Sequence, residues 1–406
     1  MTLLKRLLGG SAIIIGAALI PGLAFATAAN TTITNTVTVN YTDAANNAQP
    51  QEQASASILV NLVASAPLLS SPADVDPTTE NTAVNLIYTI TSTANGPDTY
   101  NFSSADTPTN MDNDAAFSTP SILLGATTAA SGITIGATVI TVPYDGTDDN
   151  NVNGLVAGDT IVLDPTGVAE VATILSVDES SGAATNTVTI TLVAGTTNAF
   201  PYGTPIGERA NVTVTVTTDD ITAGTFGTHS VLTTATSQED ALVATTQATA
   251  TVINVRRPVL TINKYVRNNT PASPFNTGVV AITVDGVDYY TSGVTGNPGD
   301  TMQYLIVIDN SAAGAGVASN IIVTDPVPQF TTYQSNTIEL DPGTGNFAAQ
   351  DDGDTTGAAE FDGTAGIVYV YAGAGGSAGA AGFGNGTGGT LAPGEISYIR
   401  FDVEID

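Results

Sequence analysis

Three side chains in the second half of the chain have types that could form a covalent crosslink. Lys264 is the only lysine after residue 26, and Asn310 and Asp325 follow it in the sequence. A neutral amine in a desolvated site can attack a side-chain amide while a buried acid moves the proton. The sequence therefore predicts an autocatalytic isopeptide site with Lys264 as nucleophile, Asn310 as amide and Asp325 as acid. The alternative is a surface lysine or an ordinary salt bridge.

A second group of polar residues has the spacing of an oxygen-ligand loop. The segment from Asp149 to Gly154 reads D-N-N-V-N-G, which fits the start of a calcium loop. Thr160 stands where a bidentate glutamate would complete an EF-hand, so that class is excluded. We expect a solvated acidic turn or a looser calcium site, with calcium as the sole candidate cofactor. The candidate ligands are Asp145, Asp148, Asp149, Asn151 and Asn153.

The residues needed for catalysis are scarce. His229 is the single histidine, and it lies in a turn entering a strand without a nucleophile-elbow signature; the chain contains no cysteine. Paired carboxylates could hydrolyse glycosides, but with so many aspartates their proximity is expected by chance. The sequence predicts a non-enzymatic protein. A secreted carbohydrate-active hydrolase, or an accessory carbohydrate-binding protein, is the alternative.

The elements that carry these residues are predicted to be β-strands. Apolar and polar residues alternate in Thr36–Tyr41, Val84–Thr91 and Val212–Thr217, as in strands with one buried face. Asn-Gly, Pro-Asp and Asp-Gly pairs supply the turns, and no helical periodicity of apolar residues is present. The predicted fold class is all-β, with immunoglobulin-like sandwiches. Without cysteine, disulfides cannot stabilise them.

The N-terminus and the charge indicate where the chain acts. Lys5 and Arg6 precede an apolar stretch that ends at Ala24-Phe25-Ala26, the pattern of a secretory signal peptide. The formal net charge is −30, and removal of those two cations makes it −32. A chain this acidic is unsuited to nucleic acid or an anionic membrane surface. We expect a secreted, extracellular protein without a membrane span in its mature part.

Composition and strand patterns divide the chain into four parts. Arg256-Arg257-Pro258 marks the boundary between the sandwiches, since proline cannot continue a strand ladder. Leu242–Val255 is predicted to be one long strand before that boundary. The predicted parts are a signal peptide at 1–26, a β-hairpin at 27–66 with strands near 33–41 and 54–63, a first sandwich at 67–255 containing a small inserted β-barrel at about 133–205, and a second sandwich at 256–406.

Four ordered motifs in the second sandwich resemble a known family. They are Leu260–Lys264, Pro298–Asn310, Ile321–Pro328 and Leu391–Glu395, and they are similar to the domain-of-unknown-function 11 repeat of bacterial and archaeal surface proteins. Val84–Tyr100 resembles the same repeat more faintly. The resemblance implies an immunoglobulin-like sandwich that serves as a cell-surface spacer, adhesin stalk or envelope component, with no shared enzyme activity.

The resemblance also implies a hypothesis about assembly. In such repeats the strand after Ala-Pro-Gly-Glu is followed by a hairpin that begins Ile-Thr-Asn-Thr. Here Ala392–Glu395 precedes a last strand, whereas Ile33–Thr36 begins the N-terminal hairpin. The hairpin is expected to pack on its own first domain or, alternatively, to complete the second sandwich of the next copy head to tail. The predicted function is structural or adhesive at the cell surface, with the chain itself, other surface proteins or glycans as partners.

Overall fold

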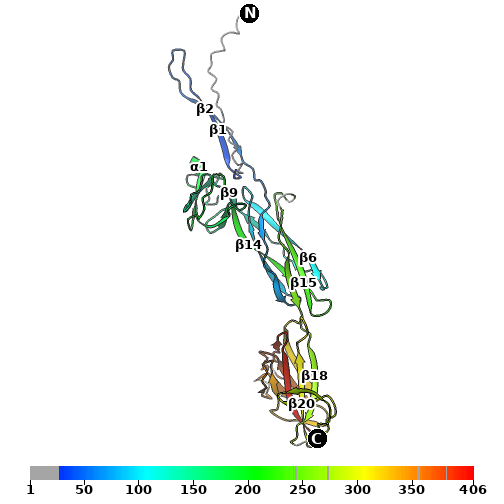
Figure 1. Ribbon diagram of the computed structural model, residues 1–406. Helices are drawn as coiled ribbons and strands as arrows, with labels where there is room; N and C mark the ends of the chain where they lie inside the picture. The colour runs from blue at the N-terminus through cyan, green and yellow to red at the C-terminus, as the bar shows by residue number, and fades with distance from the viewer. Residues whose placement is uncertain (1–26, 241, 243–244, 272–273, 354–356, 381) are drawn as a thin grey trace.

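The computed structural model describes residues 27–406 apart from 241, 243–244, 272–273, 354–356 and 381. The predicted signal peptide, 1–26, lies outside the described residues. Within the described part the chain is almost wholly β-strand, with one four-residue helix, α1 (Gly182–Thr185). The all-β prediction is therefore confirmed. The molecule is elongated, with a hairpin at one end and the second sandwich at the other (Figure 1).

The N-terminal hairpin consists of β1 (Thr32–Val39) and β2 (Glu52–Leu59). The strands are antiparallel, and Thr32 lies opposite Leu59. Every residue of both strands is exposed. The expected hairpin is therefore present, but its strands do not pack on the first domain. That expectation was wrong because the hairpin reaches the rest of the molecule only through the chain just before β1 and just after β2 and through Ile33, which borders a hollow beside the barrel.

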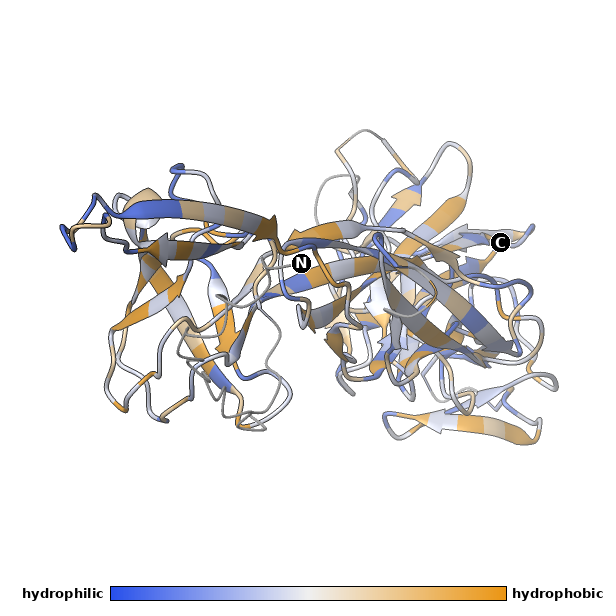
Figure 2. Cartoon of the chain, turned by 90° about the horizontal axis from the view of Figure 1, so that it is seen from above, coloured by the Kyte–Doolittle hydropathy of each residue, from blue (hydrophilic) through white to orange (hydrophobic). Residues whose placement is uncertain are grey.

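The first sandwich has two sheets whose inner faces share one core. Alternate side chains of β5 and β14, such as Tyr88 and Val214, face Tyr100 and Val231 of the opposite sheet, and all four are buried. Apolar and polar residues alternate along the strands (Figure 2). One sheet contains β3 (Leu68–Ser70), β5 (Ala83–Thr91), β7 (Ala116–Phe117) and β14 (Pro205–Thr217); the other contains β4 (Val75–Thr78), β6 (Asp98–Thr109), β8 (Ser121–Leu124), β15 (Phe226–Ser237), β16 (Thr245–Gln247) and β17 (Thr251–Arg256).

The predicted long strand at the end of this sandwich is interrupted. β16 and β17 both pair with β15, but residues 248–250 lie between them outside any strand. Gln247 lies opposite Thr234 and Thr251 opposite Val231, so this side has one more residue than β15 over the same length. An extra residue cannot join the ladder, and the strand therefore breaks.

A small barrel is inserted between β8 and the main part of β14. Its sheet runs β10-β13-β12-β11-β14, and β9 also pairs with β14. The amide of Ala130 donates to the carbonyl of Thr141 at 2.8 Å, which brings the chain after β9 to β10 and closes the ring around a separate core. The strands are β9 (Ala126–Thr128), β10 (Val139–Pro143), β11 (Thr160–Leu163), β12 (Glu170–Asp178) and β13 (Thr187–Leu192).

The second sandwich repeats the two-sheet arrangement. Alternate residues of the central strands β21 and β29, such as Ile306 and Phe401, face Val370 of the opposite sheet. One sheet contains β18 (Thr261–Asn268), β19 (Val280–Val284), β20 (Val287–Tyr290), β21 (Thr301–Asp309), β23 (Thr331–Tyr333), β24 (Glu339–Asp341), β25 (Ala348–Ala349) and β29 (Ile396–Ile405); the other contains β22 (Ala318–Pro326), β26 (Ala359–Asp362), β27 (Ile367–Ala372) and β28 (Gly389–Leu391).

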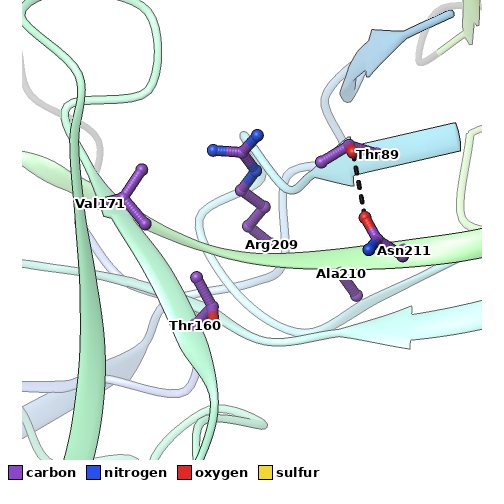
Figure 3. Close-up of a pocket in the computed structure, with 6 residues that line it drawn as sticks. All are labelled: Thr89, Thr160, Val171, Arg209, Ala210 and Asn211. Atoms are coloured by element: carbon purple, nitrogen blue, oxygen red, sulfur yellow. Dashed lines mark hydrogen bonds between the residues drawn. The ribbon is translucent and has the colours of Figure 1, made fainter. Parts of the chain in front are cut away.

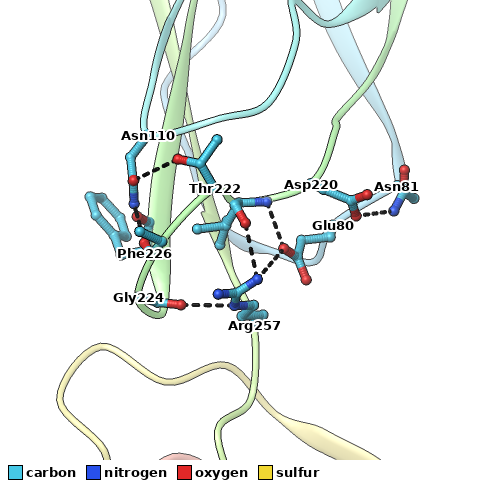
Figure 4. A network of polar contacts seen from close by, with 10 residues as sticks. Glu80, Asn81, Asn110, Asp220, Thr222, Gly224, Phe226 and Arg257 are labelled. Atoms are coloured by element: carbon cyan, nitrogen blue, oxygen red, sulfur yellow. Dashed lines mark hydrogen bonds and ion pairs between the residues drawn. The ribbon is translucent and has the colours of Figure 1, made fainter.

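The joint between the sandwiches is held by Arg257. Its Nε donates to the carbonyl of Gly224 at 2.8 Å, and its Nη1 lies 3.7 Å from Glu80 (Figure 4). The hydroxyl of Thr225 donates to the carbonyl of Ala313 at 2.7 Å, so a turn of the first sandwich is bonded directly to the second. These contacts brace the two domains end to end.

Candidate functional site

The first sandwich shows which strand closes a domain of this topology. In the first sandwich β3, β5 and β14 lie side by side, as β18, β21 and β29 do in the second. The strand after β14 is β15, and it pairs with β6 from Tyr100 to Thr109. In the second sandwich β22 follows β21 as β6 follows β5. Among the described residues, no long strand lies beside β22 where β15 lies beside β6.

Two strand edges are consequently unpaired on one side of the second sandwich. β27 pairs with β22 through Pro326, but on the other edge β28 reaches only Ala318 and Ile321. β18 pairs with β21 throughout, but on its other edge β20 reaches only Val266. Within the described part of the chain, the edges of Ile322–Pro326 and Thr261–Tyr265 thus have no partner strand. We call this region the open side.

The inner face of the sandwich is uncovered at the open side. Ile262 lies opposite Ile308 in the ladder, so both point toward the interior. Ile308 is 0% exposed, whereas Ile262 is 64% exposed. An apolar side chain on an inner face is normally covered by the facing sheet. Its exposure marks the place where no strand of the described residues covers the inner face.

Lys264 and Asp325 meet across this open side in an ion pair, which is the alternative that the sequence left beside the crosslink; the crosslink itself stays a prediction. Lys264 Nζ lies 2.7 and 2.6 Å from the two carboxylate oxygens of Asp325. The amine also lies 4.6 Å from the ring centroid of Tyr304 and 5.9 Å from that of Phe401, distances at which aromatic faces attract a cation. Burial, followed by the charge of Asp325, raises the pKa of Tyr304.

Access to this pair is one-sided. The side chains of Lys264 and Asp325 are 39% and 11% exposed. The carboxylate is therefore held in the sandwich, while the amine remains reachable from the open side. Sequence reasoning missed the two rings beneath the amine, since only the pairing of β21 with β29 places Tyr304 beside Phe401.

Asn310 does not join this pair. Its Nδ2 donates to the carbonyls of Gly316 and Leu391, both at 2.9 Å. Lys264 lies opposite Ile306, so Asn310 is about 13 Å further along the strand direction. The predicted amide is wrong because Asn310 stands after the end of β21, where it ties a neighbouring loop to the end of β28.

The hairpin of β1 and β2 has two unlike faces. On one face hydroxyl groups pair across the strands: Thr34 with Ser57, and Thr36 with Ser55, each at 2.8 Å. The other face is mostly apolar and exposed. Because side chains alternate along a strand, this apolar face consists of Ile33, Asn35, Val37, Val39, Glu52, Ala54, Ala56 and Ile58.

The root of the hairpin is anchored firmly although its strands are free. Ala29 is buried, and its amide donates to the carbonyl of Asn95 at 2.7 Å. The Asn95 side chain donates to the carbonyl of Thr27 and accepts from the amide of Val63, at 2.9 and 2.7 Å. A Cβ on Gly96 would lie 2.5 Å from that of Ala29, so this close contact requires glycine. The hairpin therefore projects from a fixed base.

The predicted calcium loop contributes to that root. Asn153 donates through Nδ2 to the carbonyl of Ala29 at 3.1 Å. Asp145, Asp149 and Asn151 accept bonds from backbone amides of the loop itself. In the described ranges no three His, Cys, Asp or Glu side chains gather to hold a metal. The structure records no hydrogen bond of the Asp148 side chain. Calcium binding at this loop therefore stays a prediction.

Sequence reasoning missed one acid in this loop. The carboxylate of Glu179 accepts bonds from the amides of Asp149 and Asn151, at 3.0 and 3.2 Å. It is buried, and burial raises the pKa of Glu179. No local motif marks this glutamate, because the turn after β12 meets the loop only in the folded barrel.

His229 has no catalytic arrangement. It is buried, with Nδ1 2.5 Å from a carboxylate oxygen of Asp106. Its Nε2 accepts from the amide of Asp219 at 3.3 Å. Both ring nitrogens are thereby engaged in the wall of the first sandwich, which leaves neither of them to activate a hydroxyl.

An open hollow of about 550 Å³ lies between the first sandwich and the barrel (Figure 3). Arg209 supplies its positive charge, and Thr89 donates to Asn211 at 3.0 Å along its floor. The described residues that line it include no carboxylate. It therefore offers no acid or base for the hydrolase alternative.

The comparisons with known proteins do not assign this chain to a family, so its class follows from its own fold. No family model matches it and no curated protein does, so the resemblance to the surface repeat stays a prediction. A solved structure similar to it is the C-terminal domain of the Streptococcus agalactiae AgI/II polypeptide BspA, at 10% identity over 84% of this chain and 91% of that chain, with a TM-score of 0.29. No helix in the described part has the length and apolar character needed to cross a membrane. The chain is an all-β protein of two immunoglobulin-like sandwiches.

Proposed function

We propose that this chain is a secreted, non-enzymatic structural protein of the cell surface that assembles head to tail. The hairpin of one copy adds to the open side of the second sandwich of the next copy. The proposal rests on one observation, two uncovered apolar surfaces in the described part of the chain. The hairpin has an apolar face that its own chain does not cover, and the inner face of the second sandwich is uncovered at the open side.

The position of the two surfaces favours contact between copies. The hairpin lies at one end of the elongated chain and the second sandwich at the other (Figure 1). The braced joint at Arg257 holds the two domains end to end. One molecule therefore presents the two surfaces at opposite ends, and repeated contacts between copies extend into a fibre.

The energetics also favour a partner for the hairpin. An isolated two-stranded hairpin is marginally stable in water. Ile33, Val37 and Ile58 are 45%, 58% and 65% exposed, and full burial of such a side chain contributes about 1.5–3 kcal/mol. Strand addition also supplies hydrogen-bond partners to the free edge of β22. Burial and edge pairing together stabilise the contact between copies.

Charge does not oppose this contact. The net charge of −30 makes most surfaces of one copy repel those of another. The two hairpin strands carry a single charged residue, Glu52. The open side carries Lys264, the only lysine after residue 26. The hairpin and the open side are thus among the surfaces on which two copies meet with the least repulsion.

The test is electron microscopy and light scattering of residues 27–406 beside two matched variants. Val37→Lys places a charge on the apolar face, and Thr36→Lys places it on the opposite face of the same strand. We expect fibres from the unchanged chain and from Thr36→Lys, and monomers from Val37→Lys. Monomeric rods from the unchanged chain, or fibres from Val37→Lys, contradict the proposal.

A further inference from the structure

We propose that Asn35 of the inserted hairpin is joined covalently to Lys264 of the neighbouring copy by an isopeptide bond, with Asp325 moving the proton. This inference rests on the head-to-tail assembly proposed above. It assigns a chemical role to three residues that the assembly brings together, and it replaces the intramolecular crosslink to Asn310 that the structure does not support.

The nucleophile is already held in place. Lys264 Nζ is fixed by both oxygens of Asp325, at 2.7 and 2.6 Å, above the ring of Tyr304. Its partial exposure faces the side where the closing strand is absent. A strand that enters the open side consequently passes directly over the amine.

The first sandwich gives a precedent for what the closing strand places there. Its closing strand β15 carries His229, and this side chain contacts Asp106 of β6 at 2.5 Å within the core. In the second sandwich Asp325 of β22 likewise lies on the inner face. A side chain from the inserted strand therefore belongs beside this carboxylate.

Asn35 is the residue of the hairpin that suits this position. β15 is the first strand of its hairpin, and by the same topology β1 is the strand that lies next to β22. The inward residues of β1 are then Ile33, Asn35, Val37 and Val39. Asn35 is the only amide on the apolar face, and it has an aliphatic side chain on each side. Insertion thus carries one carboxamide toward the pair of Lys264 and Asp325.

The reaction balances without a cofactor. When the hairpin excludes water, Lys264 transfers a proton to Asp325, since separated charges are costly in a dry site. The neutral Nζ attacks Cγ of Asn35, and a new C–N bond forms. Asp325 returns a proton to the Nδ2 group, the Cγ–Nδ2 bond breaks and ammonia leaves. Nζ gives its second proton to the released ammonia, which departs as ammonium, and Asp325 ends as the carboxylate it was at the start.

Insertion must come before the bond forms. In the single molecule β1, which carries the exposed Asn35, lies at the opposite end from β18, which carries Lys264 (Figure 1), and Asn310 is bonded to two carbonyls. In the described part of the isolated chain, the amine and the acid are therefore prepared without an amide bonded beside them. Only a hairpin inserted in the open side supplies the amide, so the crosslink forms only between correctly assembled copies.

Boiling assembled fibres of residues 27–406 in SDS tests the bond. We expect a ladder of covalent oligomers on a gel. Mass spectrometry should find a peptide pair containing residues 35 and 264 that is lighter than the sum of its parts by about 17 Da, the mass of ammonia. Fibres that boil to monomers overturn the crosslink and leave the proposed assembly intact, whereas an unchanged chain that forms no fibres overturns the assembly itself.

Three variants test the assigned residues. Lys264→Arg keeps the charge beside Asp325 but removes the amine, and Asn35→Leu keeps the branched shape but removes the amide. Both are expected to form fibres that boil to monomers. Asn40→Leu removes an exposed amide just after β1 and should keep the ladder. A ladder that persists in Lys264→Arg or Asn35→Leu overturns the assignment.

Discussion

Two hairpins of this chain share one alternating pattern and have opposite surroundings. In β15, Val231 and Ala235 are completely buried because the strand pairs with β6 and faces the other sheet. In β1, Ile33 and Val37 stand at the same alternation and are exposed. The pattern specifies that one face of a strand is to be buried, but it does not specify which molecule buries it.

The two sandwiches also differ, in whether a strand of their own chain covers the inner face. The hairpin of β15 and β17 follows β14 and closes the first sandwich within one chain. In the second sandwich Ile262 is left at the open side with its inner-face position uncovered. In the assembly that we propose, the first domain is a spacer and the second domain is the acceptor of the next hairpin.

The largest effect expected from this comparison concerns Val231 and Val37. Val231→Lys buries a charge in the first sandwich without a partner, and it should lower the free energy of unfolding by at least about 3 kcal/mol. Val37→Lys should leave the unfolding of the monomer unchanged, since its side chain is already exposed. Urea unfolding of both variants below the concentration of assembly measures the difference. Equal destabilisation by the two variants would show that β1 is also packed in the monomer.

The alternation was sufficient to predict the strands, but long-range contacts were not predictable. Val84–Thr91 and Val212–Thr217 were found because each has one buried face, and these strands pair as β5 and β14. The break at 248–250 was missed because it depends on the count of residues in β15 opposite it. Local sequence specifies a strand, whereas register against a distant partner specifies its ends.

The site was predicted in part for the same reason. Lys264 and Asp325 were identified by residue type, and they meet at 2.6 Å. Asn310 was chosen for its type as well, but tertiary packing places its amide against Gly316 and Leu391. Asn35 had a usable signal, a lone amide among alternating apolar residues. Its meaning depends on the exposure of the hairpin, which no local pattern reveals.

A second prediction converts the open sandwich into a closed one. Residues 31–60 are appended after Asp406 through a flexible Gly/Ser linker, so that the chain supplies its own closing hairpin. We expect fibres to disappear and the second sandwich to gain about 2.7 kcal/mol, if the tethered hairpin is present at an effective concentration about 100 times its dissociation constant. Light scattering and urea unfolding measure the two effects.

The control for this fusion carries Val37→Lys in the appended copy alone. Its appended hairpin cannot seat, so fibres and the original stability should both return. If the control is as stable and as monomeric as the first fusion, the appended segment acts without entering the open side. In that case the likeness between β15 and the missing strand of the second sandwich is wrong.

The smallest expected effect concerns Asp98, the buried carboxylate that meets the end of β15 where this strand closes the first sandwich. Ser237, at the end of β15, donates to the buried carboxylate of Asp98 on β6 at 2.7 Å, and burial raises the pKa of Asp98. A folded-state pKa above the unfolded one means that the ionised group destabilises the fold at neutral pH, and that this cost lessens as the pH falls through the folded pKa. Asp98→Asn removes the charge and keeps an acceptor for Ser237. The variant should be more stable than the original chain at pH 7, with a smaller advantage at pH 5, in urea unfolding at both values.

The exposed Asp114→Asn should change little. An advantage of Asp98→Asn that grows as the pH falls would mean that β15 stabilises the charged carboxylate, and that its closure of the sandwich is electrostatic as well as apolar.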